Sequence, residues 1–358
     1  MAFTFSIKDS YRQAVEAASG GKQTVIYDDQ GAPSIMNIIP KLTYKDVGLG
    51  TNTAALPAFL VDDTELSEIF VGTYMAHVDN GRAYSLPGQV PTVNINHDNA
   101  VARCRAKGKG WHCMTNAEYA AIALWCKANG YYPRGNNNYG SDHSAPHEVC
   151  RPATKGSDGR TNLCITGSGP NSWTHDGTPN GIYGLNGDAY EWAPGVRTVD
   201  GEIQVLAGNN AAKDSADLTA GSAEWRAILA SDGSLVAPGT AGTLKVEPVS
   251  GTKGTARYVT DVTNLTGDTD YTSNTFKTMA VGSGIVIPDI MKALALFPSD
   301  DSDHGGDYIY FRNGGERCFS RGGNWLFTSG AGVFFLYGSY QRTNADGSLG
   351  FRPAYISL

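Results

Sequence analysis

The stretch that decides the fold lies near the end of the chain and reads RGGNWLFTSGAGVFFLYGSYQRTNADGSLGFRPA, from Arg321 to Ala354. It begins with two glycines before Trp325 and closes on Phe351 and Arg352. Glycines allow close backbone approach, and large aromatic side chains are typical anchors of a core. The aromatic-rich run between these ends, near residues 333–340, favours a β-strand.

Strand alternation predicts two faces for this run. Successive side chains of a strand point to opposite faces of the sheet. If Phe334 and Leu336 face the core, then Phe335, Tyr337 and Ser339 face the other way. Aromatic residues gathered on an exposed face usually mark an interaction site. The alternative is that these aromatics fill a second core layer.

Two earlier segments are equally distinctive. The first, TVNINHDNAVARCRAKGKGWHCMTNAEYAAIALW at 92–125, predicts two helices. Asn96 caps the first helix, and Thr115 caps the second, with Glu118 completing a capping box. The second segment is NGIYGLNGDAYEW, residues 180–192.

In this order, the three segments resemble the motif blocks of formylglycine-generating-enzyme-like (sulfatase-modifying-factor) domains. The resemblance implies an α+β protein with an expanded C-type-lectin fold, in which two helices surround a small twisted antiparallel sheet. It covers residues 56–358, with 196–312 as a β-rich insertion, and leaves 1–55 as a small N-terminal element for attachment or oligomerisation. In such a fold we expect Arg321 and Arg352 to pair with carboxylates such as Glu191 or Glu118.

The enzymes of this family hold copper with a cysteine pair between the last two motifs, and their sulfoxide-synthase relatives hold iron with histidines. No cysteine follows Cys318 here. The prediction is therefore a protein that is not an enzyme and has no cofactor. The alternative is a metal-dependent oxidase with a relocated site, built from His143 and His147 with Asp142 or Glu148.

The last stretch is also similar to the variable proteins of diversity-generating retroelements, which include phage tail receptor-binding proteins. That resemblance implies a fixed scaffold with variable, ligand-binding positions between its residues. The scaffold is Arg321, Gly322, Gly323, Asn324, Trp325, Phe334, Gly350, Phe351 and Arg352. The variable positions are Leu326, Phe327, Phe335, Tyr337, Ser339, Tyr340, Asn344, Asp346 and Ser348.

The same resemblance implies a receptor-binding adhesin in a virion tail, with a host cell-surface receptor as its partner. The aromatic bias favours a protein receptor over a glycan. We expect a homo-oligomer, with a trimer favoured. The net charge of −7 and the absence of a basic stripe argue against nucleic-acid binding. The sequence shows neither a signal peptide nor a run of eighteen apolar residues, so secretion through a signal peptide and membrane insertion are not expected.

Outside the motifs, local patterns predict further elements. Residues 7–18 form a helix that stops at Gly20, and 24–28 with 34–42 form a hairpin. Helices are also predicted near 222–229 and 288–296. The six cysteines are expected to be reduced and mostly buried. The acidic loops 299–307 and 186–188 are interpreted as solvated loops, and the alternative is a structural calcium site with their oxygen atoms as ligands.

Overall fold

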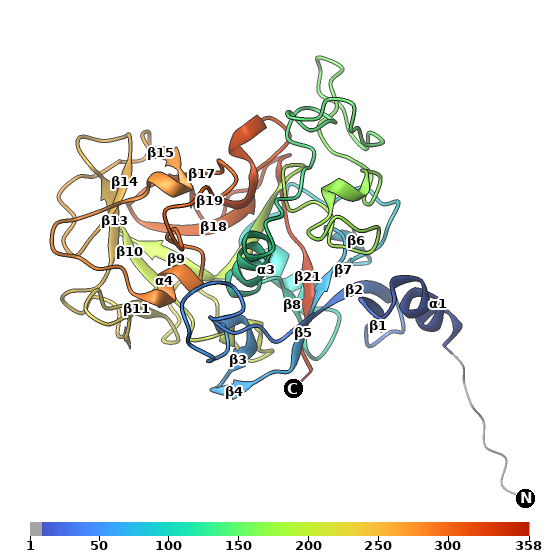
Figure 1. Ribbon diagram of the computed structural model, residues 1–358, viewed down its shortest axis with the longest axis horizontal. Helices are drawn as coiled ribbons and strands as arrows, with labels where there is room; N and C mark the ends of the chain where they lie inside the picture. The colour runs from blue at the N-terminus through green and yellow to red at the C-terminus, as the bar shows by residue number, and fades with distance from the viewer. Residues whose placement is uncertain (1–8, 358) are drawn as a thin grey trace, which may run out of the picture.

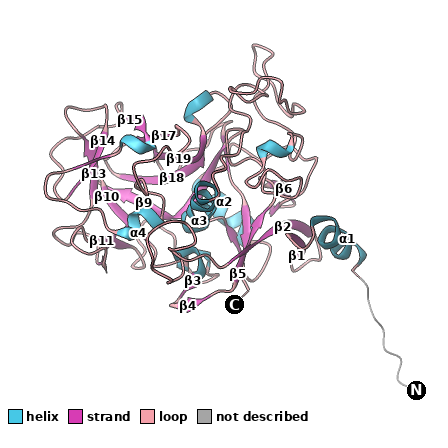
Figure 2. Ribbon diagram, viewed as in Figure 1, coloured by secondary structure: helices cyan, strands magenta, loops and turns pink. Residues whose placement is uncertain are grey.

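The helix α3, Asn116–Ala128, packs between two β-sheets near the middle of the molecule (Figure 1). This computed structural model describes residues 9–357. Strands outnumber helices in it (Figure 2), which confirms the prediction of an α+β protein at the level of secondary-structure content. Ile122 and Leu124 of α3 share one hydrophobic core with apolar side chains of both sheets.

The predicted helix caps are present. The side chain of Asn96 accepts a hydrogen bond from the backbone of Asn99 at the start of α2, His97–Arg105. At the start of α3, Thr115 and Glu118 form the predicted capping box. The first helix, α1, runs over Ser10–Ser19 and ends at Gly20, which has a positive φ of 62°. Residues 7 and 8 of that prediction lie outside the described residues.

The smaller sheet has five strands in the order β1-β2-β5-β21-β8. Their bounds are Gln23–Tyr27, Pro33–Pro40, Glu68–Gly72, Pro353–Tyr355 and Trp111–Cys113. The predicted hairpin is confirmed as β1 and β2, which pair antiparallel. Because β2 pairs with β5, this hairpin from the first 55 residues continues the sheet that also holds the C-terminal strand β21.

The larger sheet has twelve strands, nine of them in the order β15-β17-β19-β18-β9-β10-β13-β14-β16. These nine are Thr272–Thr275, Tyr308–Phe311, Gly332–Tyr340, Glu316–Gly322, Tyr190–Val199, Glu202–Val205, Lys245–Pro248, Ala256–Val259 and Ala280–Val281. The other three are β11 (Arg226–Ile228), β12 (Leu235–Val236) and β20 (Leu349–Gly350). Residues 196–312 therefore extend the sheet that β9, β18 and β19 form, on both of its sides.

Of the two other helices predicted from the sequence, one is present and one is absent. The helix near 288–296 is present as α4, Asp289–Ala293. The helix predicted near 222–229 is wrong: turns lead there into β11, whose Ala227 pairs with Gln204 of β10. Tertiary pairing outweighs the weak local helix preference of that segment.

Two short strand pairs lie outside both sheets: β3 (Leu60–Val61) with β4 (Thr64–Glu65), and β6 (His77–Asp79) with β7 (Arg82–Tyr84).

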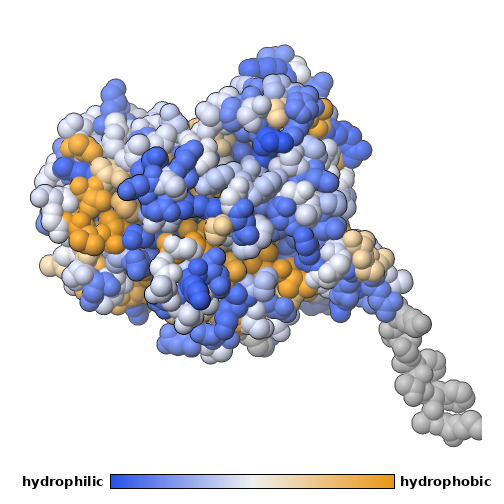
Figure 3. Space-filling view, viewed as in Figure 1, coloured by the Kyte–Doolittle hydropathy of each residue, from blue (hydrophilic) through white to orange (hydrophobic). Residues whose placement is uncertain are grey.

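The surface is mostly polar on the face shown in Figure 3, with an apolar patch over β13 and β14 on the left. Val249 and Val286, in the connections that follow β13 and β16, are exposed. Within the described residues, no helix is both long and apolar enough to cross a membrane.

Candidate binding surface

The strand β19 separates two hydrophobic cores. Phe334 and Leu336 point into the core that contains α3, and Phe335 points into a second core on the opposite face. The predicted alternation of this strand is therefore confirmed. The opposite face is covered in part, because Tyr190 of β9 lies against it.

Tyr190 is the buried centre of this second core. Its ring centroid lies 5.7 Å from that of Phe327 and 5.6 Å from that of Phe335. The corresponding distances to Tyr337 and Tyr340 are 5.3 and 5.8 Å. Four of the predicted variable positions therefore contact one buried tyrosine.

Half-buried aromatic side chains continue outward from this centre. Tyr310 of β17 lies 5.5 Å from Tyr337, ring centroid to ring centroid, and 5.6 Å from Phe327. Tyr308 and the exposed Tyr271 both contact Tyr310. We call this connected set the aromatic surface, and it consists of Tyr271, Tyr308, Tyr310, Phe327, Tyr337 and Tyr340.

The structure corrects two predicted positions. Phe335 is fully buried, with 0% of its surface exposed, and Ser339 is also buried. The reason is that β17 pairs in parallel with β19, so Tyr310 lies beside Tyr337 and covers Phe335. Phe335 therefore belongs to a second core layer, which was the alternative to an exposed face.

Most of the other predicted positions reach solvent. Leu326 is 47% exposed and follows Trp325, which is buried. Asn344 is exposed, while Asp346 and Ser348 are half-buried. The predicted variable positions therefore include both surface and core residues.

Hydrogen bonds among its own residues and with Tyr340 fix the conformation of the loop 341–348 beside the aromatic surface. The carboxylate of Asp346 accepts hydrogen bonds from the hydroxyl of Tyr340 at 3.0 Å and from that of Ser348 at 2.7 Å. Asn344 accepts a hydrogen bond from the backbone of Gln341. Burial and the nearby Asp346 charge raise the pKa of Tyr340, so its hydroxyl stays protonated and can donate.

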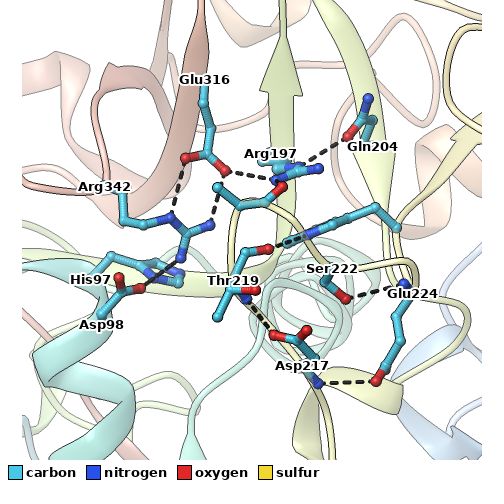
Figure 4. Close-up of polar contacts among 12 residues, drawn as sticks. His97, Asp98, Arg197, Gln204, Asp217, Thr219, Ser222, Glu224, Glu316 and Arg342 are labelled. Atoms are coloured by element: carbon cyan, nitrogen blue, oxygen red, sulfur yellow. Dashed lines mark hydrogen bonds and ion pairs between the residues drawn. The ribbon is translucent and has the colours of Figure 1, made fainter.

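Arg342 fastens the same loop to the body of the protein (Figure 4). Its guanidinium donates to Asp98 of α2 at 2.6 Å and to Glu316 of β18 at 2.9 Å. Glu316 also accepts from Arg197 at 2.8 Å. Burial acts to raise the pKa of Glu316, but hydrogen bonds from the two arginines outweigh it and lower that pKa. Glu316 is therefore a carboxylate shared by two cations, and it holds the loop to the sheet.

The scaffold residues are buried in the body of the protein. Gly322 and Gly323 adopt φ values of 84° and 77°, a region that favours glycine. A Cβ on Gly323 would lie 2.8 Å from the Cβ of Ala331, which explains the need for the smallest residue. Asn324, Trp325, Gly350 and Phe351 are buried as well.

The two predicted arginine pairs have different outcomes. Arg352 donates to Glu191 from Nε at 2.8 Å and from Nη2 at 2.6 Å, as predicted. Arg321 donates instead to the amide oxygen of Asn116 and to the backbone oxygens of Leu294 and Ala295. Pairing with a carboxylate is therefore wrong for Arg321.

Glu118 is unavailable to Arg321 because other groups already occupy its carboxylate. It accepts from His112, at 2.9 Å, and from Asn209 and the Thr115 backbone. Burial lowers the pKa of Arg321 to about 10, which leaves the side chain charged at neutral pH.

Of the four residues of the alternative metal site, His143 and Asp142 lie close together, with Nδ1 3.9 Å from Oδ1, but other groups of the protein bind both carboxylates. Arg134, Ser172 and Trp173 donate to the carboxylate of Glu148. Asp142 accepts from the backbone of Gly135 and the side chain of Asn137, and His143 and His147 are exposed. Within residues 9–357, no group of three or more His, Cys, Asp or Glu side chains is placed to hold a metal ion.

The two loops considered for calcium are tied by hydrogen bonds from the protein. Asn136 and the backbone of Cys164 donate to Asp188, and burial raises the pKa of that carboxyl to about 6. In the loop 299–307, Asp300 pairs with Lys127, and Asp307 accepts from the backbone of Phe334 at 2.7 Å.

The expectation that all six cysteines are reduced is wrong for two of them. Cys150 and Cys164 form a disulfide bond, with their Cα atoms 5.7 Å apart. The bridge closes residues 150–164, and within this loop Pro152 also pairs with Cys164. Cys104, Cys113, Cys126 and Cys318 are free and buried, as expected.

Comparison with known proteins finds no protein-family model that matches the chain and no curated protein that matches it. Both family resemblances therefore stay predictions, which rest on the motifs quoted above and on the site described here.

Proposed function

We propose that this chain is a ligand-binding display protein and that the aromatic surface, together with Leu326 and the loop 341–348, contacts the ligand. The observation that carries the proposal is a connected set of partly exposed aromatic side chains on β17, on β19 and in the adjoining loops. Soluble proteins rarely expose such a group unless it binds something. Tyrosine and phenylalanine contribute large contact area with few rotatable bonds, so they are common at binding hot spots.

The layer beneath this surface favours recognition without rearrangement. Phe335 and Tyr190 are buried and hold the rings of Phe327 and Tyr337 from below. Arg342 and Asp346 hold the adjoining loop. A ligand would therefore meet side chains that are already ordered, which reduces the entropy lost on binding.

The motifs of the last stretch supply the biological context of the proposal. With a C-type-lectin-like fold and retroelement-type diversification, the chain would be a receptor-binding adhesin of a phage or prophage tail. Its partner would be a host surface protein rather than a glycan. Oligomerisation, as a trimer, would add avidity to weak single contacts. Sedimentation of the purified chain tests the trimer directly.

Binding to bacterial cells tests the surface itself. Labelled protein is incubated with a panel of bacterial cell envelopes, either untreated, protease-treated or periodate-treated. We expect binding that protease abolishes, and that Tyr337→Ala weakens on the order of 30-fold, as a hot spot of about 2 kcal/mol does. Tyr11→Ala is the matched control, because Tyr11 is 42% exposed on α1, outside the aromatic surface. Equal loss in both variants would refute the assignment of the surface.

Genetics tests the diversification independently. The proposal expects a near-identical copy of the segment that codes for residues 321–354, and a reverse-transcriptase gene, close to the coding gene. If neither is nearby, diversification fails, although the binding surface can still be correct.

A further inference from the structure

A cavity of about 350 Å³ lies between β2, α3 and the loop at 175–176, and none of its lining residues belongs to the aromatic surface. Its wall is apolar and includes Ile39, Leu42, Ile122 and Trp125. This volume lies at the small end of the range of known ligand pockets, and apolar walls with few polar groups are typical of them.

One polar group, His175, lines this wall with an unused donor. The ring is 8% exposed, and its Nδ1 accepts a hydrogen bond from the backbone N–H of Ile182 at 2.9 Å. Burial lowers the pKa of His175 to about 4, so the ring is neutral at pH 7. A neutral imidazole that accepts at Nδ1 carries its proton at Nε2. Within the described residues, the Nε2–H has no hydrogen-bond partner.

The charged groups of the cavity neutralise each other. Lys22 donates to Asp176 at 2.9 Å, and Thr178 donates to the same carboxylate. A charged ligand would have to compete with this pair, whereas a neutral ligand leaves it intact. An acceptor oxygen on the ligand would replace water at the His175 Nε2–H, and a hydrogen bond made against an apolar wall is stronger than one made in water.

From this arrangement we propose that the cavity binds a small neutral aromatic compound that carries one hydrogen-bond-accepting oxygen, such as a ketone or an ether. The apolar wall and Trp125 receive the ring system, and the His175 Nε2–H donates to the oxygen. The site is separate from the surface proposed to contact a receptor, so either proposal can fail without the other.

The test uses 6-propionyl-2-dimethylaminonaphthalene, a neutral fluorophore with a ketone, titrated into the full chain. We expect saturable binding of one molecule per chain, with emission shifted to the blue. The variant His175→Asn keeps an acceptor for the Ile182 N–H but removes the Nε2 donor. It is expected to raise the Kd for this ketone about five- to tenfold. The ketone-free 2-dimethylaminonaphthalene should change by less than about twofold, because it makes no such bond.

A second variant distinguishes loss of the cavity from misfolding of the protein. Ile38 is half-buried and lines the cavity, so Ile38→Trp should fill it and abolish binding of both compounds, while thermal melting reports folding. Tyr337→Ala should leave binding unchanged. The inference is overturned if no saturable binding occurs, if Ile38→Trp binds like the wild type, or if Tyr337→Ala removes binding, which would place the fluorophore on the aromatic surface.

Discussion

Arg352 and Glu191 form a bidentate ion pair in which both side chains are buried, with Nε 2.8 Å from one carboxylate oxygen and Nη2 2.6 Å from the other. Arg352 also donates to the backbone oxygens of Gly72 and Tyr183. One guanidinium therefore joins the C-terminal motif, the larger sheet, the smaller sheet and the loop before β9.

Removing the charge of Glu191 should destabilise the protein strongly. Glu191→Gln leaves the buried Arg352 cation without its counter-ion, and such losses cost about 3 to 5 kcal/mol. Urea unfolding measures the change. The matched control is Glu65→Gln, because Glu65 pairs with Lys41 at the surface, where an ion pair contributes about 1 kcal/mol or less. Similar losses in both variants would contradict the assigned importance of the buried pair.

Phe335 and Tyr337 should respond differently to truncation, although they are neighbours on one face of β19. Phe335→Ala empties a fully buried site and should cost about 3 to 5 kcal/mol of stability. Tyr337→Ala removes a half-exposed ring and should cost clearly less. The exposed Leu326→Ala serves as a baseline, expected within about 0.5 kcal/mol of the wild type. If Phe335→Ala unfolds at the same urea concentration as Leu326→Ala, the second core is misassigned.

Lys107 should make the free energy of unfolding depend on pH above neutrality. Its ammonium nitrogen lies 3.1 Å from the ring centroid of Trp111 and 2.6 Å from the hydroxyl of Ser34, and burial lowers the pKa to about 7. Between pH 7 and the ordinary pKa of 10.5, the unfolded chain binds a proton that the folded protein does not. The contribution of Lys107 to the free energy of unfolding therefore rises with pH in this window, by at most about 1.4 kcal/mol per pH unit.

The comparison of two lysine variants isolates this effect. Unfolding is measured from pH 7 to about 8, below the ordinary pKa values of cysteine, tyrosine and lysine side chains. Lys107→Met should lose the slope that Lys107 contributes, whereas Lys41→Met, at a surface pair, should retain it. A slope that survives in Lys107→Met would assign the dependence to another group.

The disulfide between Cys150 and Cys164 should stabilise the loop region. The two cysteines are 14 positions apart, and closing a loop of this size contributes about 3 kcal/mol. Reductant and the double variant Cys150→Ala/Cys164→Ala should lower the unfolding midpoint equally, because the other four cysteines are free thiols. If reductant also destabilises the double variant, the effect does not come from this bridge.

Local sequence signals predicted the helices α1 to α4 and the first hairpin. The caps at Asn96 and Thr115 and the αL glycine at Gly20 depend on contacts within one helical turn. The local sequence pattern is therefore enough to predict where these helices begin or end. The helix predicted near 222–229 failed because β11 forms through pairing with a distant strand, which no local pattern contains.

The candidate surface was predicted only in part, for the same reason. Strand alternation determined that Phe334 and Phe335 point to opposite faces. It did not determine which face meets solvent, since that depends on Tyr190 and Tyr310, which precede β19 by many residues. Tyr310 and Tyr271 belong to the surface but were not predicted, because their place depends on the parallel pairing of β17 with β19 and on β15 beside it.

By itself, the sequence therefore determined the helix ends at Asn96, Thr115 and Gly20, the direction of side chains along β19 and the residues of the buried frame, such as Arg352. The tertiary structure alone decided that Phe335 is core, that Arg321 binds carbonyl groups, and that Cys150 reaches Cys164. The physical reason is range: caps and alternation act between neighbours in the chain, whereas burial, ion pairing and disulfide formation depend on which distant segments meet.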